Sequence, residues 1–142
     1  MKKLLLLGGS RFLLPVIREA KTLDCHTITC DYLPDNIAHR YSDEYHNVSI
    51  TDKEAVLELA KRLQVDGVMS FGCDPGVVTA AFVAEKLGLP VSALAAGHSA
   101  GALEAIARRF RPRVAVLYDE RAAGAMKVAL ADTETKVLSG MG

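Results

Sequence analysis

Short apolar runs and amphipathic stretches alternate along the chain from its first residues. The run Leu4–Leu7 is bounded by Gly8 and Gly9, as is typical of a parallel strand buried on both faces. Leucine also favours helices, so a buried helix is the alternative, but the short run and the glycine stop favour a strand. From Leu13 the apolar spacing becomes helical, and Pro15 fits the first turn of a helix. The start of the chain therefore predicts a strand, a glycine turn and a helix.

The same alternation continues to the end of the chain. A helix capped by Thr51 or Asp52 is expected, and further helices are expected at 77–87, 100–110 and 120–130. Further strands are expected at 26–30, 46–50, 67–71, 91–96, 113–118 and 135–138. Such alternation forms βαβ units with right-handed crossovers. We predict an α/β fold with one Rossmann-like domain over residues 1–142. In this three-layer sandwich, a parallel sheet of six or seven strands, in an order beginning 3-2-1-4-5, has helices on both faces.

Composition and charge narrow the class of protein. The 142 residues are 50% hydrophobic, enough for a folded core, and 17 basic residues balance 17 acidic ones. Nucleic-acid-binding proteins usually carry a basic excess, so this balance argues against a nucleic-acid partner. The first apolar run is too short for a signal peptide, and no stretch approaches the ~20 apolar residues of a membrane span. An odd number of cysteines without metal-type spacing indicates reduced thiols in a cytoplasmic protein: Cys25, Cys30 and Cys73.

The turn after the first strand is a candidate ligand site. Glycines there allow a ligand to approach the backbone, and the following helix N-terminus offers N–H groups to an anion. The complete dinucleotide fingerprint GxGxxG is absent, so a plain tight turn is the stronger interpretation. The candidate residues of this turn are Gly8, Gly9, Ser10 and Arg11.

Asp31 is a second candidate, because it ends the second predicted strand. It follows the glycine turn by about 20 residues, where a dinucleotide-binding fold places the acid that binds a ribose hydroxyl. The alternative is that Asp31 caps the loop that follows it.

A further turn, Gly72–Gly76, lies at the carboxyl end of a predicted strand, where open α/β sheets bind ligands. Gly72 and Asp74 are its candidate binding residues, although a helix cap at Asp74 followed by Pro75 is the stronger interpretation. Cys73 lies near the same helix N-terminus, but the sequence supplies no obvious base for a nucleophile. The four histidines lack metal-type spacing, so no metal site is expected.

Segments within the first 90 residues carry a family resemblance: LLLLGGSRFLLPVIREAK, TCDYLPDNIAHRYSDEY, SITDKEAVLELAK and VDGVMSFGCDPGVVTAAFVAEKLGLP. They resemble the N-terminal, pre-ATP-grasp domain of ATP-grasp ligases of the carbamoyl-phosphate-synthase and biotin-carboxylase type. The resemblance implies a Rossmann-like domain that closes over an active site and helps to hold substrate, while two following subdomains bind ATP. Those subdomains are missing from this sequence, so the resemblance implies no ligase activity.

The resemblance changes at residue 91, where the segments are VSALAAGHSAGALEAIARRFRPRVAVLYDERAAGAMKVAL and TKVLSG. These resemble part of the NADPH-binding domain of 1-deoxy-D-xylulose-5-phosphate reductoisomerase. The resemblance implies that the loop Gly97, His98 and Ser99 helps to bind the adenosine phosphate of the cofactor. That family commonly carries Arg-Asn where this chain has His98 and Ser99, so contact with the 2′-phosphate is not implied. The family's glycine loop and its catalytic and metal-binding domain are absent from this sequence.

Two resemblances that meet at one boundary between βα units suggest an engineered or recombined chimera. The expected function is therefore a folded scaffold without autonomous catalytic activity, needing no cofactor. The alternative is a nucleotide- or phosphate-binding module with weak affinity for ATP, NADPH or another small anion. An enzyme that uses Cys73 or Asp74 is a third hypothesis, disfavoured because no partner base is evident. Exposed sheet edges are also compatible with a homodimer.

Overall fold

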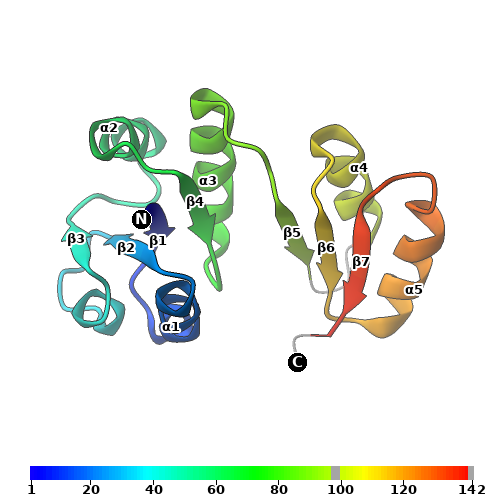
Figure 1. The fold of residues 1–142 in the computed structure, drawn as a ribbon, viewed down its shortest axis with the longest axis horizontal. Coiled ribbons are helices and arrows are strands. Elements are labelled where there is room, and N and C mark those ends of the chain that lie inside the picture. Colours follow the sequence, from blue (N-terminus) through cyan, green and yellow to red (C-terminus); the bar gives the residue numbers. More distant parts are fainter. Residues whose placement is uncertain (97–99, 141–142) are drawn as a thin grey trace. The chain divides into compact units, whose positions relative to one another are not determined.

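The computed structural model describes residues 1–96 and 100–140, and the chain divides into two compact units after Leu89 (Figure 1). The first unit holds a four-stranded parallel sheet and the second a three-stranded parallel sheet. The predicted α/β class with parallel strands is confirmed. The predicted single sheet of six or seven strands is wrong, because the described strands form two sheets. An alternation of strands and helices specifies the class, but it does not specify whether each new strand joins the existing sheet.

The first unit is built around a parallel sheet with the strand order β3-β2-β1-β4. This order matches the start of the predicted one, whereas the fifth strand pairs elsewhere. The elements of the unit, in chain order, are β1 (Lys2–Leu7), the short 3-10 helix η1 (Arg11–Leu13), α1 (Leu14–Thr22), β2 (Cys25–Cys30), η2 (Ile37–Arg40), β3 (Glu44–His46), α2 (Lys53–Leu63), β4 (Gly67–Ser70) and α3 (Asp74–Leu87).

Strand β1 is the centre of the first unit. It pairs with β2 on one side and β4 on the other, and Leu5, Leu6 and Leu7 are completely buried. Alternate side chains of a strand point to opposite faces. Leu5 and Leu7 pack with apolar residues of α2 and α3, whereas Leu6 packs with those of η1 and α1. Helices therefore cover both faces, and the first unit is a three-layer Rossmann-like sandwich (Figure 1).

The ends of the helices follow local sequence signals. The Asp52 carboxylate accepts a hydrogen bond from the backbone N–H of Ala55 at 3.1 Å, which decides between the two predicted caps of α2. Pro15 lies in the first turn of α1, and Gly88 ends α3 with a left-handed φ of 68°, as predicted. Among the described residues, no helix combines the length and the apolar character needed to span a membrane.

The third strand lies earlier than predicted. It was expected at 46–50 but runs over Glu44–His46, beside the last residues of β2. His46 pairs with Cys30, where β2 ends, so residues beyond His46 have no neighbouring strand residues to pair with. The backbone then turns at once, since the N–H of Val48 donates to the carbonyl of His46 at 3.0 Å.

The second unit has a simpler construction, with the strand order β5-β6-β7. Side chains of both its helices pack against Ala115 and Leu117, which lie on one face of the central strand. The prediction of helices on both faces is therefore wrong for this unit, which is a two-layer arrangement. Its elements are β5 (Ala93–Ala96), α4 (Ala100–Phe110), β6 (Val114–Leu117), α5 (Glu120–Ala129) and β7 (Lys136–Ser139).

The cap of α5 offers a test of the second unit. The Asp119 carboxylate accepts a hydrogen bond from the N–H of Ala122 at 2.9 Å. We expect Asp119→Ala to lower the free energy of unfolding by about 1 kcal/mol, because one N–H at the helix start loses its partner. Asp119→Asn should retain most of the stability, since asparagine caps equally well. Urea denaturation followed by circular dichroism measures both, and equal losses would contradict the assigned cap.

Candidate functional site

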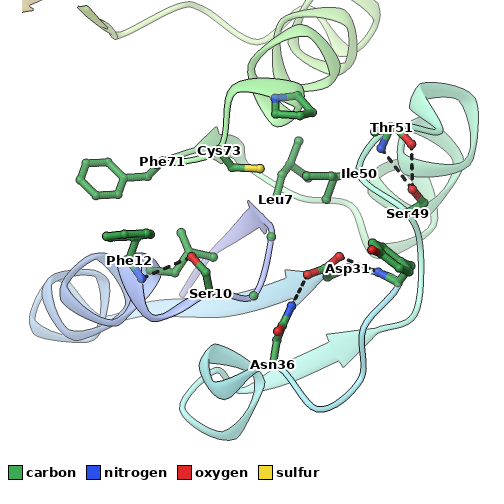
Figure 2. A pocket seen from close by; sticks show the side chains of 16 residues that line it. Leu7, Ser10, Phe12, Asp31, Asn36, Ser49, Ile50, Thr51, Phe71 and Cys73 are labelled. Atoms are coloured by element: carbon green, nitrogen blue, oxygen red, sulfur yellow. Dashed lines mark hydrogen bonds between the residues drawn. The ribbon is translucent and has the colours of Figure 1, made fainter. Parts of the chain in front are cut away.

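A cavity of about 370 Å³ opens in the first unit at the carboxyl ends of its strands (Figure 2). Its walls come from the segments that follow β1, β2, β3 and β4. Open α/β sheets bind ligands at this end of their strands. The lining residues are Leu7, Gly8, Gly9, Ser10, Phe12, Leu13, Asp31, Tyr32, Asn36, Ser49, Ile50, Thr51, Phe71, Gly72, Cys73 and Pro75.

The structure brings together half of the residues that the sequence singled out. Gly8, Gly9, Ser10, Asp31 and Gly72 all line the cavity. Arg11 does not belong to the described lining, and Asp74 is the first residue of α3. The remaining candidates, Gly97, His98 and Ser99, lie outside the described residues.

The glycine turn closes tightly over the end of β1. Gly8 has a φ of 119°, a region that favours glycine, and its N–H donates to the carbonyl of Cys30 at 2.9 Å. Ser10 caps η1, because its hydroxyl oxygen accepts a hydrogen bond from the N–H of Phe12 at 3.3 Å. The turn thus leads into a short 3-10 helix before α1 begins. Arg11 instead places its guanidinium carbon 5.8 Å from the centroid of the Phe12 ring.

Gly9 is required by packing. A Cβ atom at this position would lie 2.5 Å from Cε1 of His39 and 2.7 Å from Cβ of Asn36. The Gly9 carbonyl also accepts a hydrogen bond from the N–H of Ala38 at 2.9 Å. The glycine turn is therefore held against the segment that carries η2.

The His39 ring packs next to Gly9 of this turn and is held in place by hydrogen bonds. Its Nδ1 lies 2.8 Å from the Thr29 hydroxyl, and its Nε2 lies 3.2 Å from the carbonyl oxygen of Leu33. A carbonyl only accepts hydrogen bonds, so Nε2 carries the proton and Nδ1 accepts from Thr29. Burial lowers the pKa of His39 and so favours this neutral ring, which also packs against Tyr45 with centroids 3.9 Å apart.

Asp31 caps the loop after β2, as one of its two interpretations predicted, and it also lines the cavity. Its Oδ1 accepts a hydrogen bond from the N–H of Tyr32 at 2.7 Å, and its Oδ2 accepts one from Nδ2 of Asn36 at 2.5 Å. These bonds cap the loop after β2, and Asp31 is only 7% exposed. An ionised carboxylate accepts about four hydrogen bonds, so Asp31 keeps acceptor capacity for a ligand in the cavity that it lines.

The turn after β4 differs in detail from the prediction. Cys73, not Asp74, occupies the cap position of α3, and the Ser70 hydroxyl donates to the Cys73 carbonyl at 2.9 Å. The chain turns already at Gly72, whose φ is 66°. The extended backbone of Cys73 therefore precedes the helix, and Asp74 already belongs to its first turn.

Sequence reasoning missed the residues that give the cavity its character. Phe12 and Phe71 flank the glycines of two turns, and Ser49 and Thr51 lie between β3 and α2. Both serine and threonine hydroxyls lie at the cavity, 2.9 Å from each other. The only indication in the sequence was that each of these residues directly follows a strand or precedes a helix. The hydroxyl pair was missed because Ser49 fell within the strand expected at 46–50.

Among the described residues, the cysteines and histidines form no metal site, and Cys30 is a buried thiol. Burial and the neighbouring Asp31 raise the pKa of the Cys30 thiol to about 12, so it stays protonated and unreactive at neutral pH. All three cysteines are free. No group of three potential metal ligands converges within residues 1–96 and 100–140.

Two histidines instead share one carboxylate at the edge of the sheet. Nε2 of His26 lies 2.8 Å from Oε1 of Glu44, and Nε2 of His46 lies 3.0 Å from Oε2. The hydrogen bonds from His46 and His26 lower the pKa of Glu44. This cluster ties β2 to the edge strand β3.

Comparisons with known proteins give partial matches. No family model matches the chain. It is 40% identical to the formate-dependent phosphoribosylglycinamide formyltransferase of Synechococcus sp. (strain WH7803) over 60 residues, 42% of this chain and 15% of that protein. It is 47% identical to the 1-deoxy-D-xylulose 5-phosphate reductoisomerase of Halothermothrix orenii over 51 residues, 36% of this chain and 13% of that protein.

A solved structure extends the comparison to the fold. The phosphoribosylglycinamide synthetase of Anaerococcus prevotii has a TM-score of 0.58 and 24% identity, covering 93% of this chain and 35% of that one. Both predicted resemblances are confirmed. The chain spans only a small part of each relative that it matches, and the two distinct partial matches fit a chimeric chain.

The packing of Gly9 gives a direct test of the turn. We expect Gly9→Ala to lower the free energy of unfolding by about 1–3 kcal/mol, because the new methyl group overlaps His39 and Asn36. Gly124→Ala is the matched control: nothing lies within 4 Å of its Cβ position, in the interior of α5. Alanine should stabilise that helix by up to about 1 kcal/mol. Equal effects of the two variants in urea denaturation would contradict the packing described for Gly9.

The Glu44 cluster predicts a pH dependence of stability. The pKa of Glu44 lies below its ordinary value of 4.5 in the folded chain. Its contribution to stability is therefore present above pH 4.5 and is lost as the pH falls through the lowered pKa. The difference in unfolding free energy between the native chain and Glu44→Gln should shrink as the pH is lowered below 4.5. A difference that stays constant over this range would contradict the role of the two histidines.

Proposed function

We propose that the first unit is a non-catalytic binding module for a nucleotide-type ligand, in a chain that joins two βα pieces of different origin. The observation that carries this proposal is the cavity at the carboxyl ends of β1, β2 and β4. Its volume of about 370 Å³ falls within the range of about 300–1,000 Å³ that small-molecule sites occupy.

The position of candidate residues supports a ligand site. The glycine turn and Asp31 come from separate strands yet line the same cavity. Each has an evident structural role, in the turn or in the loop, and each also faces the cavity. The partial similarity to a protein named as a phosphoribosylglycinamide formyltransferase supports a ligand that carries a ribose.

The chemistry of the described lining supports binding without catalysis. Covalent or acid–base catalysis needs a nucleophile within hydrogen-bond reach of a base. Among the described lining residues, Cys73 is the only thiol, and none is a histidine or a lysine. Asp31 is the only carboxylate of that lining, and both of its oxygens accept hydrogen bonds from the protein.

The boundary after Leu89 supports a joined chain. The two compact units divide at this residue, and the family resemblance in the sequence changes after residue 90. Each unit carries its own parallel sheet and its own buried apolar residues, two clusters in the first unit and one in the second. Two pieces that each bury a separate core are compatible with an origin from two parents.

A ligand panel tests the proposal. A compound that binds only the folded state raises the melting temperature, and at 100 times its Kd it adds about 2.7 kcal/mol of stability. We expect at least one of ATP, ADP and NADPH to produce such a shift in the native chain. Asp31→Asn should reduce the shift, because a charged acceptor in the cavity is lost. A temperature scan of the purified chain with each compound provides the measurement.

The control for this panel is Asp132→Asn in the second unit. The side chain of Asp132 is 68% exposed, pairs with Arg108 of the same unit and is not among the described residues that line the cavity. Each variant is compared with its own melting temperature without ligand, so a loss of the Arg108 pair does not affect the comparison. If neither these compounds nor adenosine shifts the melting temperature of the native chain, the module proposal fails and a scaffold without a ligand site takes its place.

A further inference from the structure

The cavity has two chemically different ends. Figure 2 shows the rings of Phe12 and Phe71 on one side, and Asp31 with Ser49 and Thr51 on the other. The first end is apolar and aromatic, whereas the second offers oxygen atoms. A ligand that fills both ends needs a flat apolar part and a part rich in hydroxyl groups.

The aromatic end is suited to a flat ring. Phe12 is 55% exposed although it is a large apolar side chain, and it lies close to the glycine turn after β4. A Cβ atom on Gly72 would come within 3.1 Å of Cβ of Phe12, so a larger residue there would displace this side chain by a few tenths of an ångström. Aromatic side chains bind bases by stacking, and they accept any base because every base has a π-face.

The oxygen-rich end is suited to hydroxyl groups. The Asp31 carboxylate uses one acceptor position on each oxygen for Tyr32 and Asn36, which leaves acceptor positions on both. The Ser49 and Thr51 hydroxyls are bonded to each other, and hydroxyls donate and accept at once. A pair of neighbouring ligand hydroxyls can donate to the carboxylate and exchange hydrogen bonds with this pair.

The described lining offers a phosphate no cationic side chain. None of the described lining residues is lysine, arginine or histidine, and the one charged side chain is the Asp31 carboxylate, which repels an anion. The first turn of α3 adds little, since Pro75 has no N–H and the N–H of Gly76 donates to the Cys73 carbonyl at 3.1 Å. The N–H of Gly8 is likewise used by the Cys30 carbonyl.

We infer that the cavity recognises the uncharged part of its ligand, a nucleoside-like group with an aromatic ring and neighbouring hydroxyls, and leaves any phosphate outside. The ring lies at the Phe12 and Phe71 end, and the hydroxyls meet Asp31. This inference rests on the proposed function and specifies its ligand class. It differs from the phosphate-binding alternative in which the glycine turn holds the charged group.

Calorimetric titrations of the full chain test this assignment. The probes are adenosine, 2′,3′-dideoxyadenosine, AMP and inorganic phosphate. We expect adenosine to bind at least as tightly as AMP, dideoxyadenosine to bind at least about tenfold more weakly than adenosine, and inorganic phosphate to give no heat of binding. The loss for dideoxyadenosine reflects the hydrogen bonds to a charged acceptor that its missing hydroxyls no longer make.

Two variants assign the ends of the cavity. Asp31→Asn should weaken adenosine about tenfold and leave dideoxyadenosine unchanged, because only the hydroxyls meet this side chain. The Asn36 amide can rotate to pair with the new side chain, so the loop keeps its cap. Phe12→Leu should weaken both nucleosides at least about fivefold, since stacking is lost while the apolar character stays. Phe110→Leu, in the second unit, is the matched control and should change neither.

The outcomes separate this inference from the proposed function. AMP or phosphate binding at least tenfold more tightly than adenosine would overturn the inference and leave the binding module intact. Equal losses of both nucleosides in Asp31→Asn would also overturn it, because the carboxylate would then act through the loop alone. If none of the four probes nor ATP, ADP or NADPH binds, the proposed function itself fails.

Discussion

The structure of the candidate site depends on the parallel pairing of β1 between β2 and β4. Leu5, Leu6 and Leu7 have no exposed surface, because helices cover both faces of this strand. Burying three leucines contributes several kcal/mol and fixes which way each side chain points. Since the neighbouring strands run parallel, their carboxyl ends meet at one edge, and the turns that follow them line the same cavity.

Much of the first unit could be predicted from these leucines and the glycines after them. The apolar run, the helical spacing and the stops at Gly8 and Gly88 each report a local preference of the backbone, and local preferences are visible in a sequence. The sequence also indicated Asp31 and Gly72 by their positions after strands. The edge strand β3 was misplaced because its extent depends on where β2 ends, which is a property of the pairing.

The parts that could not be predicted depend on contacts between distant segments. No local pattern shows that Phe12 and Phe71 lie at one end of a cavity whose other end is formed by Asp31 and two hydroxyls. The division into two sheets could not be predicted either, because the alternation of apolar and polar residues in a strand does not show which strand it pairs with. Similarity to two kinds of protein, each over a part of the chain, accords with two separately built cores.

The central claim is that the first unit binds a nucleoside-like group in this cavity. A two-dimensional ¹H–¹⁵N NMR spectrum of the labelled chain, recorded as adenosine is added, tests it most directly, because each backbone amide reports its own surroundings. The account predicts shifts concentrated in residues 8–12, 31–36, 49–51 and 71–73, with the signals of residues 100–140 unchanged. Shifts confined to residues 100–140, or a spectrum unaltered at millimolar adenosine, would contradict it.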